Sequence, residues 1–123
     1  MKETFGIFVR EKRESLQLSV RGFARQIDIS AVYLSKIENG LRPAPKDDIV
    51  ERIADRLALS QIEREILLDL AAESKAYLSL ASDLIVYINE NKVIHKILRI
   101  GKSCKVDSED WQKILDYLSN KYL

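Results

Sequence analysis

The stretch "SAVYLSK", residues 30–36, combines side chains suited to close contact with a polar partner. It holds two serine hydroxyl groups, two small apolar side chains that would face outward, and one lysine. Hydroxyls both donate and accept hydrogen bonds, and lysine donates from a compact charge. A helix that only faces solvent more often displays Glu, Lys and Gln on that side. The pattern therefore indicates a slim helix that lies against another molecule.

Residues that catalyse reactions or hold metals are sparse. His95 is the only histidine, and no metal-ligand spacing surrounds it. Cys104 is single, so an internal disulfide is impossible and a reducing, cytoplasmic compartment is expected. The chain carries no glycine-rich phosphate loop and no nucleophile motif. We expect no enzyme activity, no cofactor and no metal.

Composition favours a helical globular protein. Of 123 residues, 46% are hydrophobic and 32% are charged, which excludes a disordered chain. Only four glycines and two prolines occur, and strand-like alternation is scarce. The start, "MKETFGIFVREKRE", lacks the apolar run of a signal peptide, and no apolar run reaches membrane-spanning length. The sequence predicts an all-α fold with no membrane association.

Charge is distributed unevenly along the chain, although the net charge is only +1. Residues 1–46 hold nine Lys/Arg against five Asp/Glu, whereas residues 47–74 hold three against eight. Residues 75–123 hold eight against six. The positive block contains the slim helix, which fits either a surface that faces a polyanion or chance clustering of charge on a solvated face.

Hydrophobic periodicity predicts five helices before residue 75. Thr4, Ser19 and Ser30 are N-cap candidates for the first three, and Asn39-Gly40 stops the third. "LRPAP" is a turn before the fourth, and Ser60 with Glu63 has capping-box spacing for the fifth. The predicted inward positions are Phe5, Phe8, Val9, Val20, Phe23, Ala24, Ile27, Leu34, Ile37, Ile49, Ile53, Leu57, Ile62, Ile66, Leu67 and Leu70.

The pattern restarts after "AAESK" and predicts about three further helices, the last capped by Ser108. We therefore divide the chain into residues 1–74 and a helical tail, residues 75–123. The apolar positions of the tail are Leu78, Ala81, Leu84, Ile85, Ile88, Val93, Ile94, Ile97, Leu98, Trp111, Ile114, Leu115 and Leu118. These stripes need a partner, which is a second chain or helices 1 and 5 of the same chain.

The stretch "LSVRGFARQIDISAVYLSKIENGLRPAP", followed by "IADRLAL", resembles the lambda-repressor-like, or XRE-type, helix-turn-helix regulators. The resemblance implies a five-helix DNA-binding domain ahead of the helical tail. Two positions depart from the family pattern. Asp28 stands where the turn usually has Gly, and Asp enters the left-handed region at modest cost. Gly22 replaces a larger polar residue, and either close approach to a phosphate or packing against a neighbour explains it.

The resemblance implies roles for specific residues. The third helix enters the major groove of duplex DNA, where bulky outward side chains would hold it away. Its outward face consists of Ser30, Ala31, Val32, Ser35 and Lys36. The side chains assigned to the phosphate backbone are Arg21, Tyr33, Asn39 and Arg42, with a packed aromatic as the alternative for Tyr33. Arg13 and Glu38 form a structural ion pair beneath this helix, so Arg13 is not a DNA contact.

Two functions remain open from sequence. The first is a sequence-specific regulator of transcription, acting as a repressor, whose tail forms a homodimer on two half-sites. The second is an antitoxin-like or adaptor protein whose C-terminal helices bind a protein partner. The sequence does not distinguish repression from activation, and it does not identify the operator, the regulated genes or an inducer.

Overall fold

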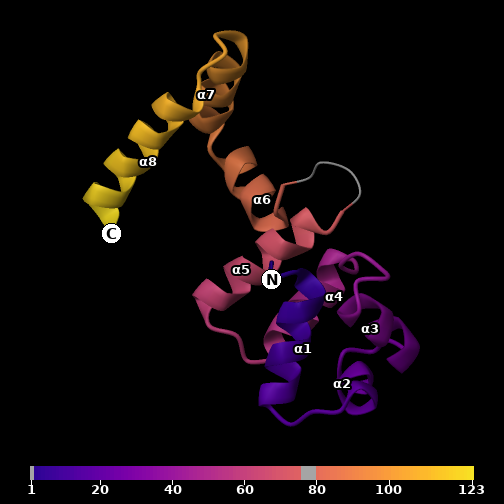
Figure 1. Ribbon diagram of the computed structural model, residues 1–123. Helices are drawn as coiled ribbons and strands as arrows, with labels where there is room; N and C mark the ends of the chain where they lie inside the picture. Colours follow the sequence, from indigo (N-terminus) through magenta and orange to yellow (C-terminus); the bar gives the residue numbers. More distant parts are fainter. Residues whose placement is uncertain (1, 76–79) are drawn as a thin grey trace. The chain divides into compact units, whose positions relative to one another are not determined.

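The computed structural model describes residues 2–75 and 80–123, which form eight α-helices and no strand. This confirms the all-α prediction. The helices are α1 (Phe5–Ser15), α2 (Val20–Gln26), α3 (Ala31–Glu38), α4 (Asp47–Arg56), α5 (Gln61–Glu73), α6 (Ser82–Glu90), α7 (Lys92–Ser103) and α8 (Ser108–Tyr122) (Figure 1). Leu78, predicted to lie in the sixth helix, falls outside the described residues. No helix in the described ranges is long and apolar enough to cross a bilayer.

The chain divides into two compact units, Met1–Ile85 and Val86–Leu123. The division falls inside α6, and Ala81 is buried in the core of the first unit. The first unit therefore includes a few residues of the predicted tail. The functional division into residues 1–74 and 75–123 stays a prediction.

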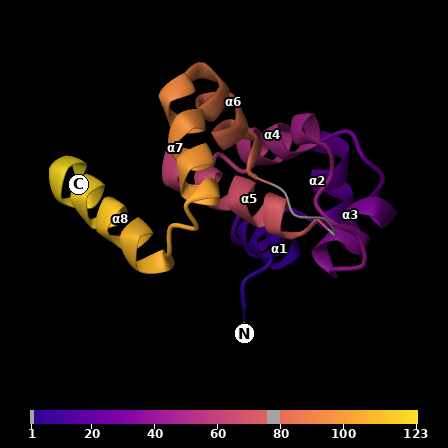
Figure 2. The ribbon, with the colours of Figure 1, turned by 90° about the horizontal axis from the view of Figure 1, so that it is seen from above.

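Helices α1 to α5 of the first unit form a domain built around one hydrophobic core. In it, α3 packs on both α1 and α2, and α5 packs on both α1 and α4 (Figure 2). The largest fully buried side chains are Val9, Phe23, Ile27, Leu34, Ile37, Val50, Ile53 and Leu67. Most of them stand at predicted inward positions, because one apolar stripe per helix is enough to assemble such a domain.

The predicted caps define where α1, α2, α3 and α5 begin. Thr4, Ser19, Ser30 and Ser60 each accept a hydrogen bond from the backbone N–H three residues later. Glu63 completes the capping box by accepting from the Ser60 backbone N–H. Because the carboxylate of Glu63 also accepts from Lys12, its pKa is lowered to about 2. These local bonds confirm the cap predictions.

The buried faces of α4 and α5 differ from the predicted ones. Val50 and Ala54 are buried, whereas Ile49 is only partly buried. On α5 the buried residues are Leu67, Leu68 and Ala71; Ile62 and Ile66 are exposed and Leu70 is partly buried. On α4 the predicted Ile53 and Leu57 are buried, and Val50 and Ala54 only widen the same stripe. On α5 apolar residues lie on more than one face, so periodicity alone could not choose the side that meets the core.

A close approach between α1 and α3 depends on Gly6. A Cβ atom at this position would lie 2.3 Å from the carbonyl oxygen of Ile37 and 2.8 Å from that of Glu38. Only a residue without a side chain lets the two backbones come this near. Gly6 therefore sets how far α3 stands from the rest of the domain.

The end of α5 holds the turn that precedes α4. The Ala44 N–H donates to Ser74 Oγ at 2.9 Å, and Lys75 Nζ donates to the Ala44 carbonyl at 3.0 Å. Ser74 Oγ also donates to the Ala71 carbonyl. Both backbone groups of Ala44 are thus satisfied, which fixes the path of the chain after α3.

The second unit leaves much apolar surface exposed. Trp111 lies against Gly101, where an added Cβ would meet the indole ring at 2.5 Å, so this contact joins α7 to α8. The cap of α8 is Asp107, not Ser108 as predicted, because the Asp107 carboxylate accepts the Asp110 N–H. Side chains at least two-fifths exposed include Tyr87, Val93, Ile97, Leu98, Ile100, Ile114, Leu115, Tyr117, Leu118 and Tyr122.

Replacing Gly6 by Ala tests the close approach. Ala raises helix propensity by about 1 kcal/mol, but its Cβ conflicts with two backbone carbonyls that cannot rotate away. We expect Gly6→Ala to lower the free energy of unfolding by roughly 1–3 kcal/mol, measured by denaturant titration. Gly22→Ala is the matched control, because its Cβ meets only the flexible Ser19 hydroxyl. Equal effects of the two substitutions would contradict the Gly6 account.

Candidate nucleic-acid interface

Two short helices, α2 and α3, joined by a tight turn, carry the candidate interface. The turn needs a left-handed residue, and Asp28 supplies it with φ 59°. The Ile29 N–H then donates back to the Ala24 carbonyl at 3.0 Å, which closes the end of α2. Ile27, fully buried, anchors the turn to the core. The feasibility of Asp28 in this turn is thereby confirmed.

The outward side of α3 is slim and accessible. Val32 is 65% exposed, and Lys36 is also exposed. Ala31 and Ser35 are half-buried at the edge of the same face, while Leu34 points into the core. No described residue of the predicted outward face is fully buried, so nothing bulky prevents the helix from approaching a partner closely.

A shallow hollow of about 370 Å³ lies on this side of the domain. Two segments of chain form it, the first turns of α3 and the loop after it. The lining residues are Ser30, Val32, Tyr33, Lys36, Arg42 and Pro43. Five of them were predicted from sequence to meet DNA; Pro43 was missed. The structure thus gathers residues from both sides of Gly40 at one surface.

The predicted ion pair lies beneath α3. Arg13 donates from Nε to Glu38 Oε2 at 2.8 Å and from a terminal nitrogen to Oε1 at 2.9 Å. Both residues are buried, and Arg13 also donates to the Leu18 carbonyl at 2.7 Å. The hydrogen bonds to Glu38 raise the pKa of the Arg13 guanidinium above its usual value. The pair joins the end of α1 to the end of α3, and both charges are satisfied inside the protein.

Asn39 ends α3 and is exposed, but its side chain already has partners. Its amide oxygen accepts from Arg10, and its Nδ2 donates to Ser35 Oγ at 3.3 Å. Sequence reasoning missed Arg10. The signal was its spacing, since Arg10 stands three residues before Arg13 and therefore on the same side of α1.

The remaining predicted contact, Arg21, is exposed in the first turn of α2 and does not line the hollow. Tyr33 lines the hollow and also packs partly against the core, which supports the packed-aromatic alternative, while its phosphate contact stays a prediction. Gly22 donates its N–H to Ser19 Oγ, and a Cβ there would lie 2.9 Å from that oxygen. This contact favours the packing explanation for Gly22.

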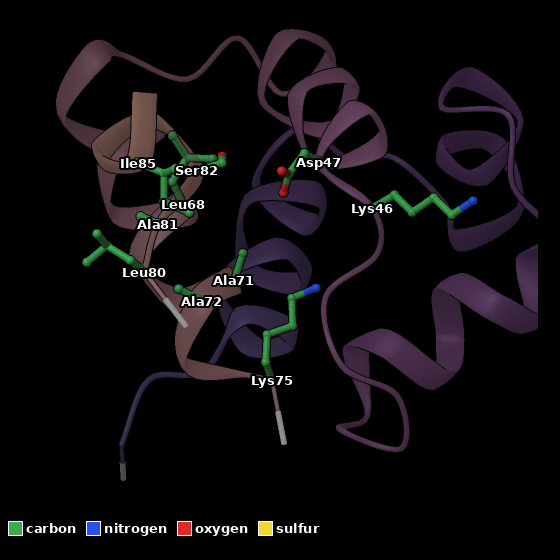
Figure 3. A pocket seen from close by; sticks show the side chains of 10 residues that line it. All are labelled: Lys46, Asp47, Leu68, Ala71, Ala72, Lys75, Leu80, Ala81, Ser82 and Ile85. Atoms are coloured by element: carbon green, nitrogen blue, oxygen red, sulfur yellow. The ribbon is translucent and has the colours of Figure 1, made fainter. Parts of the chain in front are cut away.

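A second hollow of about 480 Å³ lies elsewhere in the first unit (Figure 3). In Figure 3, Leu68, Ala81 and Ile85 gather on one side while the Lys46 side chain extends away from them. The ammonium of Lys75 is held by the Ala44 carbonyl. Within residues 2–75 and 80–123, no group of three or more His, Cys, Asp or Glu side chains is placed to hold a metal ion.

Comparison with known proteins identifies the domain. Residues 4–67 match the model of the family described as "Helix-turn-helix domain". The chain belongs to this helix-turn-helix family. The match covers α1 to α4 and the start of α5, including every residue placed above at the candidate interface. The lambda-repressor-like resemblance inferred from sequence is thereby confirmed.

Named relatives of this helix-turn-helix chain include regulators from two bacteria. One is the "Uncharacterized HTH-type transcriptional regulator Rv0474" of Mycobacterium tuberculosis (strain ATCC 25618 / H37Rv), 40% identical over 55 residues. Another is the "HTH-type transcriptional repressor RghR" of Bacillus subtilis (strain 168), 37% identical over 57 residues. The matches cover 45% and 46% of this chain and 39% and 42% of those proteins, so the chain spans about two-fifths of their length.

A solved structure shares the fold over the whole chain. The chain is similar to one titled "SinR protein/SinI protein complex", with a TM-score of 0.50 and 22% identity. The alignment covers 96% of this chain and 97% of the other. At this identity the likeness establishes only the all-α fold, for the helix-turn-helix domain together with the helices that follow it.

Replacing Arg13 by Met tests the buried pair. The change leaves the Glu38 carboxylate buried without its main partner, which typically costs about 3–5 kcal/mol. We expect a lower melting temperature by circular dichroism with little change in any DNA sequence preference. The double variant Arg13→Met/Glu38→Leu removes both charges and should recover most of the loss. An unchanged melting temperature for Arg13→Met would contradict a structural role.

Proposed function

We propose that this chain is a sequence-specific double-stranded DNA-binding regulator of transcription that acts as a repressor and inserts α3 in the major groove. The observation that carries the proposal is the hollow that joins the slim face of α3 to the loop after it. The regulator names of the relatives support it. Binding of this kind needs no chemical reaction, cofactor or metal. The proposed location of the protein is the cytoplasm, where its DNA lies.

Base contacts come from the outward face of α3. Ala31 and Val32 touch thymine methyl groups, and Ser35 exchanges a hydrogen bond with a base edge. Lys36, exposed at the hollow, reaches guanine O6 or N7. Since two of these four side chains are apolar, direct readout is modest, and DNA shape supplies the rest of the discrimination.

Phosphate contacts fix the register of the domain on the duplex. We assign them to Arg21, Tyr33, Asn39 and Arg42. Arg42 and Tyr33 flank the hollow from opposite segments, so they suit phosphate groups beside the groove that α3 enters. Ser30 lies at the N-terminus of α3, where its hydroxyl already caps the helix.

The second unit suits a homodimer. Its apolar side chains are exposed on α7 and α8, and an uncovered surface of this kind favours association. A two-fold pair would place two α3 helices about 34 Å apart, one turn of DNA. The alternative function, an antitoxin-like or adaptor protein, uses the same exposed helices to bind a different protein. The solved structure that matches 96% of this chain is titled as a complex of two proteins, which supports this alternative.

Selection of bound duplexes from a random pool tests the function. We expect one preferred sequence, and a palindromic product together with a dimeric mass in sedimentation would support the homodimer. A monomer with a non-palindromic product would favour the protein-partner alternative. A chain that binds no duplex even at low salt would overturn the proposal.

Replacing Lys36 by Ala tests base readout. We expect a loss of roughly 1–3 kcal/mol on the selected duplex and relaxed preference at one position, because a good base contact is worth this much. Fluorescence anisotropy on the selected duplex and on single-base variants measures both effects. Lys46→Ala removes an exposed lysine outside the hollow of α3 that is at most a phosphate contact, so as the matched control it should relax preference at no position. An equal loss on every sequence would make Lys36 a phosphate contact instead.

Replacing Arg42 by Ala tests the phosphate clamp. We expect similar weakening on selected and mixed-sequence duplexes, because a phosphate contact carries no sequence information. The slope of log K against log salt should fall in magnitude by about 0.9, the value for one phosphate contact. Weakening confined to the selected duplex would contradict this role.

A further inference from the structure

Arg10 reaches the candidate interface from α1, outside the two helices assigned to DNA. Its guanidinium donates to the amide oxygen of Asn39, and its Nε lies 3.6 Å from Glu38 Oε1. The Arg10 side chain is 40% exposed, whereas that of Glu38 is 1% exposed. Arg10 therefore stands between the buried ion pair and the surface at the end of α3.

The charge of Arg10 is not required to satisfy Glu38. Arg13 already binds both carboxylate oxygens, in the two-bond arrangement that matches a guanidinium to a carboxylate. Arg10, Arg13 and Glu38 together carry one net positive charge, and the exposed Glu14 carboxylate lies 3.8 Å from Arg13. Because Arg13 is buried and Arg10 is half-exposed, this charge is presented to solvent by Arg10.

Arg10 also determines how the Asn39 amide points. With its oxygen turned to the Arg10 guanidinium, Asn39 presents its Nδ2 on the other side, where it donates to Ser35 Oγ at 3.3 Å. A side-chain amide has two N–H donors and a guanidinium has five, so both groups keep donors for an external acceptor. Two adjacent groups that hold spare donors and one net positive charge match a phosphate.

We propose that Arg10 is a further DNA-binding residue, which orients the Asn39 amide and places its own guanidinium against one phosphate at the C-terminal end of α3. The inference rests on the proposed function and extends it to a third helix. Arg10 contributes affinity and register, and it contributes no base specificity.

Salt dependence of binding tests the phosphate contact. For Arg10→Gln, the slope of log K against log salt should fall in magnitude by about 0.9, so a tenfold rise in salt weakens the variant about eightfold less than the wild type. The effect should be equal on the selected duplex and on a mixed-sequence duplex. Arg10→Lys, which keeps the charge, should restore the slope. Arg56→Gln removes an exposed arginine from the end of α4 and should leave the slope unchanged.

A double-mutant cycle tests the coupling to Asn39. If Arg10 orients the amide, Arg10→Gln/Asn39→Ala should lose less affinity than the two single losses combined. Circular dichroism on every variant separates folding from binding. A wild-type chain that binds no duplex would overturn the proposed function and this inference together. Wild-type binding with an unchanged Arg10→Gln slope, or a lower melting temperature without a slope change, would overturn this inference alone.

Discussion

The buried bond between Arg13 and Glu38 is the constraint on which the interface depends. A carboxylate this deeply buried is tolerated only when a cation and good hydrogen-bond geometry satisfy it. Arg13 provides both and reaches the Leu18 carbonyl as well, so it ties α1, the loop before α2 and the end of α3 together. The outward face of α3 keeps its orientation because its inner side is held at this point.

Close packing and local hydrogen bonds also hold α3 and the loop after it in place, as the ion pair does. Gly6 lets α1 approach the carbonyl groups at the end of α3, and the left-handed Gly40 turns the chain sharply away from that end. Ser74 and Lys75 then fix Ala44 two residues after Arg42. A loop next to a ligand needs such support, because loops otherwise move more than the helices they join. The hollow is therefore supported by α1, by the inner side of α3 and by the two residues that follow α5.

Sequence periodicity predicted this domain well where each helix has one apolar stripe. The stripes of α1, α2 and α3, the serine and threonine caps and the left-handed Asp28 follow from interactions within a few residues, which a sequence can reveal. The predicted inner face of α5 was partly wrong, because Ile62 and Ile66 are exposed, and that of α4 omitted the buried Val50. Choosing between two apolar faces requires knowledge of where the other helices lie.

The sequence by itself determined the helical class, the caps of α1, α2, α3 and α5, the turn between α2 and α3 and the small outward residues of α3. The family resemblance added the pairing of Arg13 with Glu38. Only the tertiary structure decided that Arg10 meets Asn39, that Pro43 joins the hollow, and that Gly6 lies against α3. The first contact joins residues 29 positions apart, the second brings together segments on either side of Gly40, and the third depends on how closely two backbones approach. Local spacing describes one helix at a time, so it contains no information about such distances.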